Sequence, residues 1–175
     1  APTQTLADVD GLERESILIL LHGMLVPLTR AHGLGVCHGD LHPRNVAFGS
    51  AAETYVLDWG GGSVAKGEFT GHPGYAAPEL LVGESPTPAT DVYSWGCIAW
   101  ELLTGNALRA SRSGETLGEA VLRWREQPQV SPPEYLGVEL AELLRGALAT
   151  DPKDRRFSRG GPWEACGLRW RRERA

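Results

Sequence analysis

The chain has 175 residues, 42% of them hydrophobic and 22% charged, and a formal net charge of −5 at pH 7. This length allows one domain or one large lobe with a buried core. The negative charge excludes a global basic field that would attract nucleic acid or an anionic membrane. The longest apolar stretch, 17–28, is too short and too interrupted to span a bilayer.

The first third of the chain is expected to form a long helix followed by short strands. A polar start with a short helical turn at 6–9 leads into an apolar run over 13–32, which predicts a mostly buried helix. Pro27 lies inside this run and should kink the helix or split it in two. Apolar pieces that are too short for helices then predict strands at 36–37, 46–48 and 55–57.

The remaining chain is expected to be a long loop and then helices. Residues 58–79 contain six glycines and predict a loop. The most apolar helix is expected over 91–103, where Gly105 could end it. Weaker helical patterns follow at 117–126, 136–149 and 162–172. The predicted fold class is therefore α+β and mainly α, a helical lobe with small β-hairpins on one edge.

The three cysteines, Cys37, Cys97 and Cys166, show no CxxC spacing. An odd number of cysteines without metal-ligand spacing is typical of reduced thiols in a cytosolic protein, so a cytoplasmic location is expected. Cys97 falls in the most apolar helix and is expected to be a small buried hydrophobic residue.

The residues with the most chemical information follow the predicted strand at 36–37. Asp40 lies on the loop between two predicted strands, and the amide Asn45 returns toward it. A second carboxylate, Asp58, comes from the end of the strand at 55–57. Two hard oxygen ligands near one spare carboxylate are what a Mg²⁺–phosphate site requires, since the metal takes oxygen donors and the spare carboxylate orients a hydroxyl nucleophile.

These residues stand in motifs that resemble the landmarks of the protein kinase catalytic domain. The run HGDLHPRN at 38–45 is similar to the catalytic loop, usually HRDxxxxN, and DWG at 58–60 is similar to the magnesium-binding tripeptide, usually DFG. Further landmarks follow in the family's order: APE at 77–79, the helix-F aspartate at Asp91, and a DPxxR motif at 151–155. The ordered set covers nearly all of the chain, which resembles the eukaryotic-like protein kinase superfamily throughout.

The resemblance implies that residues 1–175 form the C-terminal lobe of a kinase domain, with a catalytic loop at 38–45 and an activation segment at 58–79. The family's N-terminal lobe, with its Gly-rich loop and strand lysine, is expected to be missing from the chain. Because ATP normally lies between the two lobes, the chain is expected to be a fragment, or the product of a degenerate gene, with weak ATP binding and low activity alone.

The resemblance also implies ATP and Mg²⁺ as cofactors and gives roles to the loop residues. Asp40 is expected to be the catalytic base, and Arg44 a catalytic cation at a position where many tyrosine kinases have an arginine. Asn45 and Asp58 are expected to hold the Mg²⁺ ions that bridge the ATP phosphates, and Ala47 is expected to lie beneath the adenine.

Five further residues are expected to support the site. His38 and Trp59 pack beneath it, Glu79 and Arg155 form an ion pair that fixes the end of the activation segment, and Asp91 accepts hydrogen bonds from the catalytic-loop backbone. Such support matters because phosphoryl transfer depends mostly on positioning and charge stabilisation.

Three positions depart from the family pattern. Gly39 replaces the usual arginine of the catalytic loop, so regulation by phosphorylation of the activation segment is not expected. His42 stands where Ser/Thr kinases have a lysine that contacts the γ-phosphate, and a histidine is largely neutral at pH 7. His72 replaces the threonine that marks Ser/Thr specificity, although the spacing of Pro73 and Tyr75 still favours Ser/Thr over Tyr.

The resemblance predicts a protein kinase that transfers the ATP γ-phosphate to a protein hydroxyl, with a protein substrate as partner and no nucleic acid or membrane. One alternative is a pseudokinase-like binding module that transfers nothing, favoured by the missing N-terminal lobe, Gly39 and His42. Another is a small-molecule phosphotransferase of the aminoglycoside type, which also has an HGDxxxxN loop but generally lacks the sequences AAPE, DVYSWG and DPKDR. The oligomeric state is not predicted.

The site residues also have simpler interpretations. The two carboxylates of the catalytic motifs could be ordinary turn residues, Asp91 could be the N-cap of an apolar helix, and Glu79 and Arg155 could be unrelated solvated charges. The HxDxH pattern at 38–42 could bind zinc, although no further ligand follows at a suitable spacing. The basic residues of 153–175 could form a solvated helix or an anionic docking patch.

Overall fold

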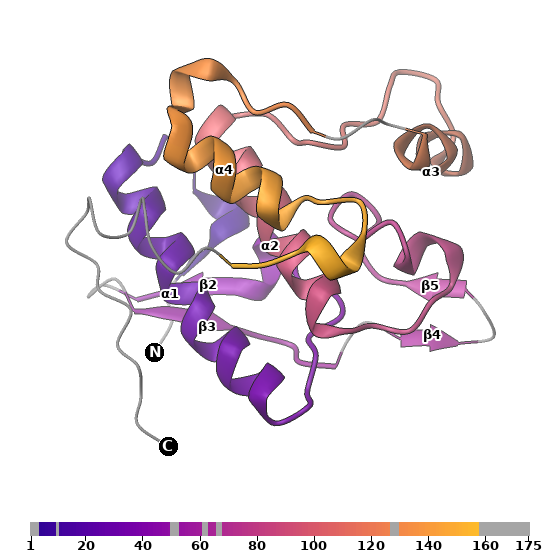
Figure 1. Cartoon of the computed structure of the whole chain (residues 1–175), viewed down its shortest axis with the longest axis horizontal. Helices are drawn as coiled ribbons and strands as arrows, with labels where there is room; N and C mark the ends of the chain where they lie inside the picture. The colour runs from indigo at the N-terminus through magenta and orange to yellow at the C-terminus, as the bar shows by residue number, and fades with distance from the viewer. Residues whose placement is uncertain are drawn as a thin grey trace.

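A computed structural model describes residues 4–9, 11–49, 53–60, 63–65, 68–126 and 130–157. Within them, helices pack around a central helix and two small antiparallel sheets complete the structure (Figure 1). The α+β, mainly α fold class is therefore confirmed. The helix expected at 162–172 and Cys166 lie outside the described residues. No helix in the described ranges is both long and apolar enough to cross a membrane.

The long helix α1 runs from Arg14 to Gly33 and is buried along one side. Pro27 lies inside this helix without dividing it, so of the two expected outcomes, a kink or a split, the split is wrong. A proline in a helix interior costs about 3 kcal/mol, whereas each fully buried leucine stabilises the fold by about 2 kcal/mol. The buried apolar side chains that outweigh the proline come from both sides of it: Ile17, Leu18, Leu20, Leu21, Met24, Leu25 and Leu28.

The larger sheet has the antiparallel order β1 (Gln4–Thr5), β2 (Val46–Phe48), β3 (Thr54–Val56). Two of the expected strands are thus confirmed, as β2 and β3. The strand expected at 36–37 is wrong. The Val36 amide donates instead to the Ala31 carbonyl at 2.9 Å, so this residue closes the end of α1 and does not pair with a strand.

A second hairpin lies within the segment that was expected to be only a loop. Strand β4 (Ser63–Ala65) pairs antiparallel with β5 (Glu68–Thr70). Both strands, SVA and EFT, include a polar residue and lie among the glycines of 58–79, so they show no apolar run that would distinguish them from a loop. A short 3₁₀ helix, Leu80–Val82, follows and ends at Gly83, whose φ of 87° is in the left-handed region that favours glycine.

The most apolar helix is α2 (Pro88–Thr104), which lies at the centre of the fold (Figure 1). It starts three residues earlier than expected because Thr87 precedes a proline in the first helical position, where proline is well tolerated. Gly105 ends it as expected, with a φ of 71°. The indole Nε1 of the fully buried Trp95 donates to the Leu21 carbonyl at 3.1 Å, which joins α2 to α1.

Two further helices, α3 (Leu117–Arg125) and α4 (Val138–Ala147), confirm the weaker helical patterns between 117 and 149. Helix α4 lies beside α2, and α3 lies away from α1 at the other end of the molecule (Figure 1). At Gly96 a Cβ would be only 2.9 Å from the Leu148 Cδ2, so the glycine permits this close approach. Cys97 is 1% exposed, which confirms it as a small buried residue.

Candidate active site

One buried carboxylate on α2 holds the backbone of the loop that carries Asp40. Asp91 is fully buried, and its two oxygens accept hydrogen bonds from the amides of His38 at 2.8 Å and Gly39 at 2.9 Å. The His32 Nε2 lies 2.8 Å from the same carboxylate and carries the hydrogen, because an ionised carboxylate only accepts. The backbone hydrogen bonds expected for Asp91 are present. Asp91 lies inside α2, so the N-cap alternative is wrong.

His38 joins this loop to the strand that leads to Asp58. The His38 Nε2 lies 2.7 Å from the Leu57 carbonyl oxygen, and its Nδ1 accepts from the Asp40 amide at 3.2 Å. The side chain is fully buried. Both of its ring nitrogens nevertheless have hydrogen-bond partners, and these are protein atoms. Its ring centroid lies 5.2 Å from that of Trp59, which remains 36% exposed. His38 thus links the two segments that carry the carboxylates.

The three groups expected to act on a nucleotide and its metal share one open recess of about 470 Å³. Asn45 is 7% exposed, and its Nδ2 donates to the Asp40 carbonyl at 3.0 Å, which leaves the amide oxygen as its acceptor atom. Asp58 has a φ of 54°, a strained backbone for a residue other than glycine. The recess is lined by Asp40, His42, Asn45, Asp58, Trp59 and Gly60.

The donor atoms of this recess fit a magnesium ion better than a zinc ion. Mg²⁺ takes hard oxygen ligands and is usually bound by one or two carboxylates together with substrate phosphates, which the carboxylates and the Asn45 amide match. The zinc interpretation of 38–42 is not supported, because both nitrogens of His38 bond to protein atoms. In the part of the chain that the structure describes, no group of three or more His, Cys, Asp or Glu side chains is arranged to hold a metal.

The C-terminal part of the 58–79 segment reaches Asp40 directly. The His72 amide donates to the Asp40 Oδ1 at 2.8 Å, while the other oxygen lies 3.8 Å from the His42 Nε2. The rings of His42 and His72 are 5.2 Å apart, and the Tyr75 ring is 5.0 Å from His72. Burial lowers the pKa of His42 more strongly than the nearby Asp40 raises it, so His42 is neutral at pH 7.

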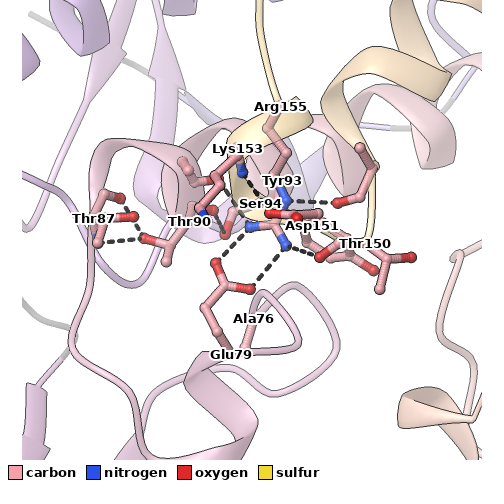
Figure 2. A network of polar contacts seen from close by, with 12 residues as sticks. Ala76, Glu79, Thr87, Thr90, Tyr93, Ser94, Thr150, Asp151, Lys153 and Arg155 are labelled. Atoms are coloured by element: carbon pink, nitrogen blue, oxygen red, sulfur yellow. Dashed lines mark hydrogen bonds and ion pairs between the residues drawn. The ribbon is translucent and has the colours of Figure 1, made fainter.

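A buried ion pair fixes the end of the same segment. Glu79 and Arg155 form two hydrogen bonds, at 2.5 and 2.8 Å, across 76 residues of sequence (Figure 2). Arg155 also donates to the carbonyls of Ala149 at 2.7 Å and Thr150 at 2.9 Å. The expected ion pair is present, and the interpretation of these residues as unrelated solvated charges is wrong.

Two residues predicted for the site do not line the recess. Ala47 is 2% exposed in the middle strand of the sheet, where it pairs with Thr5 and Tyr55. Arg44 is exposed in the middle of the 3₁₀ turn Pro43–Asn45. The recess therefore contains Asp40, Asn45 and Asp58 but neither the predicted adenine-contacting residue nor the predicted catalytic cation.

Three contacts near the site involve residues to which the sequence assigned no role. His32 pairs with Asp91, the Tyr75 hydroxyl donates to Glu101 on α2, and Arg109 is buried against the segment before Glu79. None of the kinase-like motifs of this sequence includes His32, Glu101 or Arg109. Their importance depends on neighbours distant in sequence, which only the folded chain brings together.

Comparison with known proteins gives a consistent result. Residues 4–159 match the family model described as the protein kinase domain. The serine/threonine-protein kinase PknK of Mycobacterium tuberculosis is 36% identical over 154 residues, which cover 84% of this chain and 14% of that protein. The serine/threonine-protein kinase PknD of Chlamydia abortus is 27% identical over 164 residues, with 80% and 18% covered.

A probable serine/threonine-protein kinase of Dictyostelium discoideum is also similar, at 28% identity over 156 residues. That match covers 86% of this chain and 18% of the relative. The chain therefore spans less than a fifth of the length of these curated relatives.

Proposed function

The chain belongs to the protein kinase domain family, and from this we propose that it provides the catalytic lobe of an ATP- and Mg²⁺-dependent protein kinase. The reaction would transfer the γ-phosphoryl group of ATP to a protein hydroxyl. One observation carries the proposal: two carboxylates and an amide oxygen share a recess, on a loop whose backbone a buried aspartate holds. On this proposal 1–175 is a partial kinase domain, 38–45 is the catalytic loop and 58–79 is the activation segment.

In the proposed reaction Asp40 accepts the hydroxyl proton of the substrate. Its Oδ1 is occupied by the His72 amide, so Oδ2 is the oxygen available to the hydroxyl. Asn45 and Asp58 would hold Mg²⁺, which when bound neutralises the charge on the phosphates. The curated relatives are named serine/threonine kinases, which together with the spacing of Pro73 and Tyr75 favours serine or threonine as acceptor. The cysteine pattern supports a cytoplasmic location.

The proposal predicts that Asp40→Ala removes phosphotransfer. The test measures transfer from γ-phosphate-labelled ATP with Mg²⁺ to a library of serine- and threonine-containing peptides, using the chain together with any coding sequence that precedes it in its gene. The rate should fall by at least about 100-fold, because a positioned general base contributes that much or more. Asp154→Ala, which removes an exposed carboxylate from a short turn, is the matched control and should keep the rate. Equal rates for the two variants would refute the role of Asp40.

A second candidate is a binding module that transfers nothing. It is favoured by one observation: the recess contains His42, which burial keeps neutral, where Ser/Thr kinases have a lysine. A thermal-shift titration with Mg-ATP separates the two candidates. A rise in the melting temperature with nucleotide favours the kinase, and a melting temperature that does not respond to nucleotide favours the module.

A further inference from the structure

A buried guanidinium lies against the segment that runs from His72 to Glu79. Arg109, in the connection after α2, is only 5% exposed. Its Nη1 donates to the Ala76 carbonyl and its Nη2 donates to the Tyr93 hydroxyl at 2.7 Å. Among the described residues no carboxylate pairs with this guanidinium, so its charge is compensated by neutral oxygens.

Aromatic faces provide the rest of the compensation. The Arg109 Cζ lies 4.9 Å from the centroid of the Tyr93 ring and 5.8 Å from that of Trp124 on α3. Cations over such faces are stabilised electrostatically. A buried charge without a carboxylate partner is still costly compared with an apolar side chain of the same size, so packing alone does not explain an arginine here. The specific feature that the guanidinium adds is its hydrogen bond to the Ala76 carbonyl.

This bond is one of two arginine contacts that hold the segment, one at its middle and one at its end. Arg155 lies 4.8 Å from the same Tyr93 ring and binds the Glu79 carboxylate. Tyr93 therefore contacts two guanidiniums, one attached to Ala76 and the other to Glu79. Four residues before Ala76, the His72 amide donates to the Asp40 Oδ1, so a fixed Ala76 also limits the movement of the group that orients Asp40.

We propose that Arg109 is a positioning residue for phosphotransfer. Its guanidinium donates to the Ala76 carbonyl while a second nitrogen is held by the Tyr93 hydroxyl, which fixes the carbonyl in place. Residues 72–76 are thereby held where the His72 amide contacts Asp40 and where a protein substrate would approach. The inference rests on the proposed function for its catalytic consequence, but its structural part, the restraint of 72–76, is independent of activity. A lysine would keep the charge but lacks the planar fork by which two separate nitrogens, Nη1 and Nη2, reach Ala76 and Tyr93.

The first test measures amide hydrogen exchange in the 175-residue chain for wild type, Arg109→Met and Arg109→Lys. Arg109→Met should accelerate exchange at His72 and its neighbours up to Ala76 by about 10-fold or more, with little change in α1, and Arg109→Lys should have an intermediate effect. The matched control is Arg123→Met. Arg123 also lies over Trp124, at 5.9 Å, but donates to Glu115 and Ala110, so its loss should leave 72–76 protected.

If Arg109→Met does not fold, Tyr93→Phe replaces it in the same measurement. This variant keeps the aromatic ring and removes only the hydroxyl that accepts from Arg109, so exchange at 72–76 should rise by a few-fold. Unchanged exchange at 72–76, or acceleration that is equal throughout the chain, would overturn the inference.

The second test measures steady-state kinetics with the chain and any coding sequence that precedes it. Arg109→Met should raise the KM for a peptide substrate by about 10-fold while the KM for ATP stays constant. General destabilisation of the fold does not produce this difference between the two KM values. If wild type transfers phosphate and Arg109→Met has unchanged kinetics, the inference fails and the proposed function stands. If wild type transfers none, the proposed function fails, and the exchange experiment still decides whether Arg109 restrains the segment.

Discussion

At Asp91, one carboxylate accepts from the amides of His38 and Gly39 and from the His32 ring. No apolar or neutral side chain can accept three hydrogen bonds in this geometry, and all the donors lie in or near the protein interior. The position of Asp40 relative to α2 therefore depends on a single buried side chain. Two of the three bonds come from backbone amides, so these two do not depend on the identity of residues 38 and 39.

Replacement of this carboxylate should be costly. Asp91→Asn keeps the shape but exchanges one acceptor oxygen for an NH₂ group that faces a donor, so we expect the free energy of unfolding to fall by about 3 kcal/mol. Urea denaturation measures it. Asp154→Asn, in an exposed turn, should change the same quantity by less than about 0.5 kcal/mol. A loss of similar size in both variants would contradict the assigned role.

The neutral histidines predict how stability depends on pH. Burial lowers the pKa of His22 and is the largest influence on His42, whose pKa is also lowered. The unfolded chain, with histidine pKa values near 6.5, therefore binds protons before the folded chain does. This contribution is fully present above about pH 6.5 and is lost as the pH falls through and below that value.

We therefore expect the free energy of unfolding to decrease between about pH 7 and about pH 5.5. In His42→Gln the decrease should be smaller, with the remainder from His22. Urea denaturation at several pH values provides the measurement. If the free energy of unfolding changes equally with pH in the variant and in wild type, His42 is not held neutral.

At the scale of elements, the contact between α1 and β3 depends on a glycine. A Cβ at Gly23 would lie 2.3 Å from the Thr54 Oγ1 and 2.8 Å from its Cβ. The Cβ of a threonine cannot rotate away, so relief would require a shift of the strand. Helix α1 and the sheet that leads to Asp58 are thus positioned by the absence of a side chain.

Gly23→Ala should accordingly destabilise the protein by about 2 kcal/mol, because the steric cost exceeds the gain of about 1 kcal/mol in helix propensity. Gly118→Ala is the matched control: Gly118 also lies in a helix, α3, but apart from its chain neighbours and the helix's own backbone no described atom lies within 4 Å of the new methyl group. It should be neutral or stabilise by up to about 1 kcal/mol. Thermal unfolding distinguishes the two, and stabilisation by both would contradict the close approach.

At the scale of the whole molecule, the Glu79–Arg155 pair connects the end of the 58–79 segment with the last part of the described chain. The pair joins residues 76 apart in sequence, and the guanidinium is fully buried. Additional bonds from Arg155 to backbone carbonyls satisfy its remaining donors. The link restrains two regions that share no other ion pair among the described residues.

Breaking this pair from one side should be severe. Glu79→Gln leaves a buried guanidinium without its counter-charge, and we expect a loss of about 3–5 kcal/mol in the free energy of unfolding. The double variant Glu79→Gln with Arg155→Met should lose less than the sum of the single variants, which urea denaturation can measure. Glu115→Gln, which removes the partner of Arg123 in a pair that is only partly buried, should have a smaller effect. Additive losses would contradict a direct coupling.

The sequence predicted the order of elements and most site residues, but with characteristic errors. Strands β2 and β3 and helices α2, α3 and α4 follow from apolar patterns and glycine signals. The strand at 36–37 was wrong because a backbone bond to the helix end, invisible in the pattern, takes the Val36 amide. The hairpin of β4 and β5 was missed because its strands, SVA and EFT, are not apolar runs and lie among glycines.

By itself, the sequence determined which chemical groups are available: the carboxylates Asp40 and Asp58, the Asn45 amide and the ion-pair partners of the later motifs all stand in recognisable order. Only the tertiary structure decided which of them meet. It brings the His72 amide to Asp40, His32 to Asp91 and Arg109 to Ala76. The physical reason is that local patterns encode the burial of each element, whereas hydrogen bonds between distant segments depend on how the elements pack.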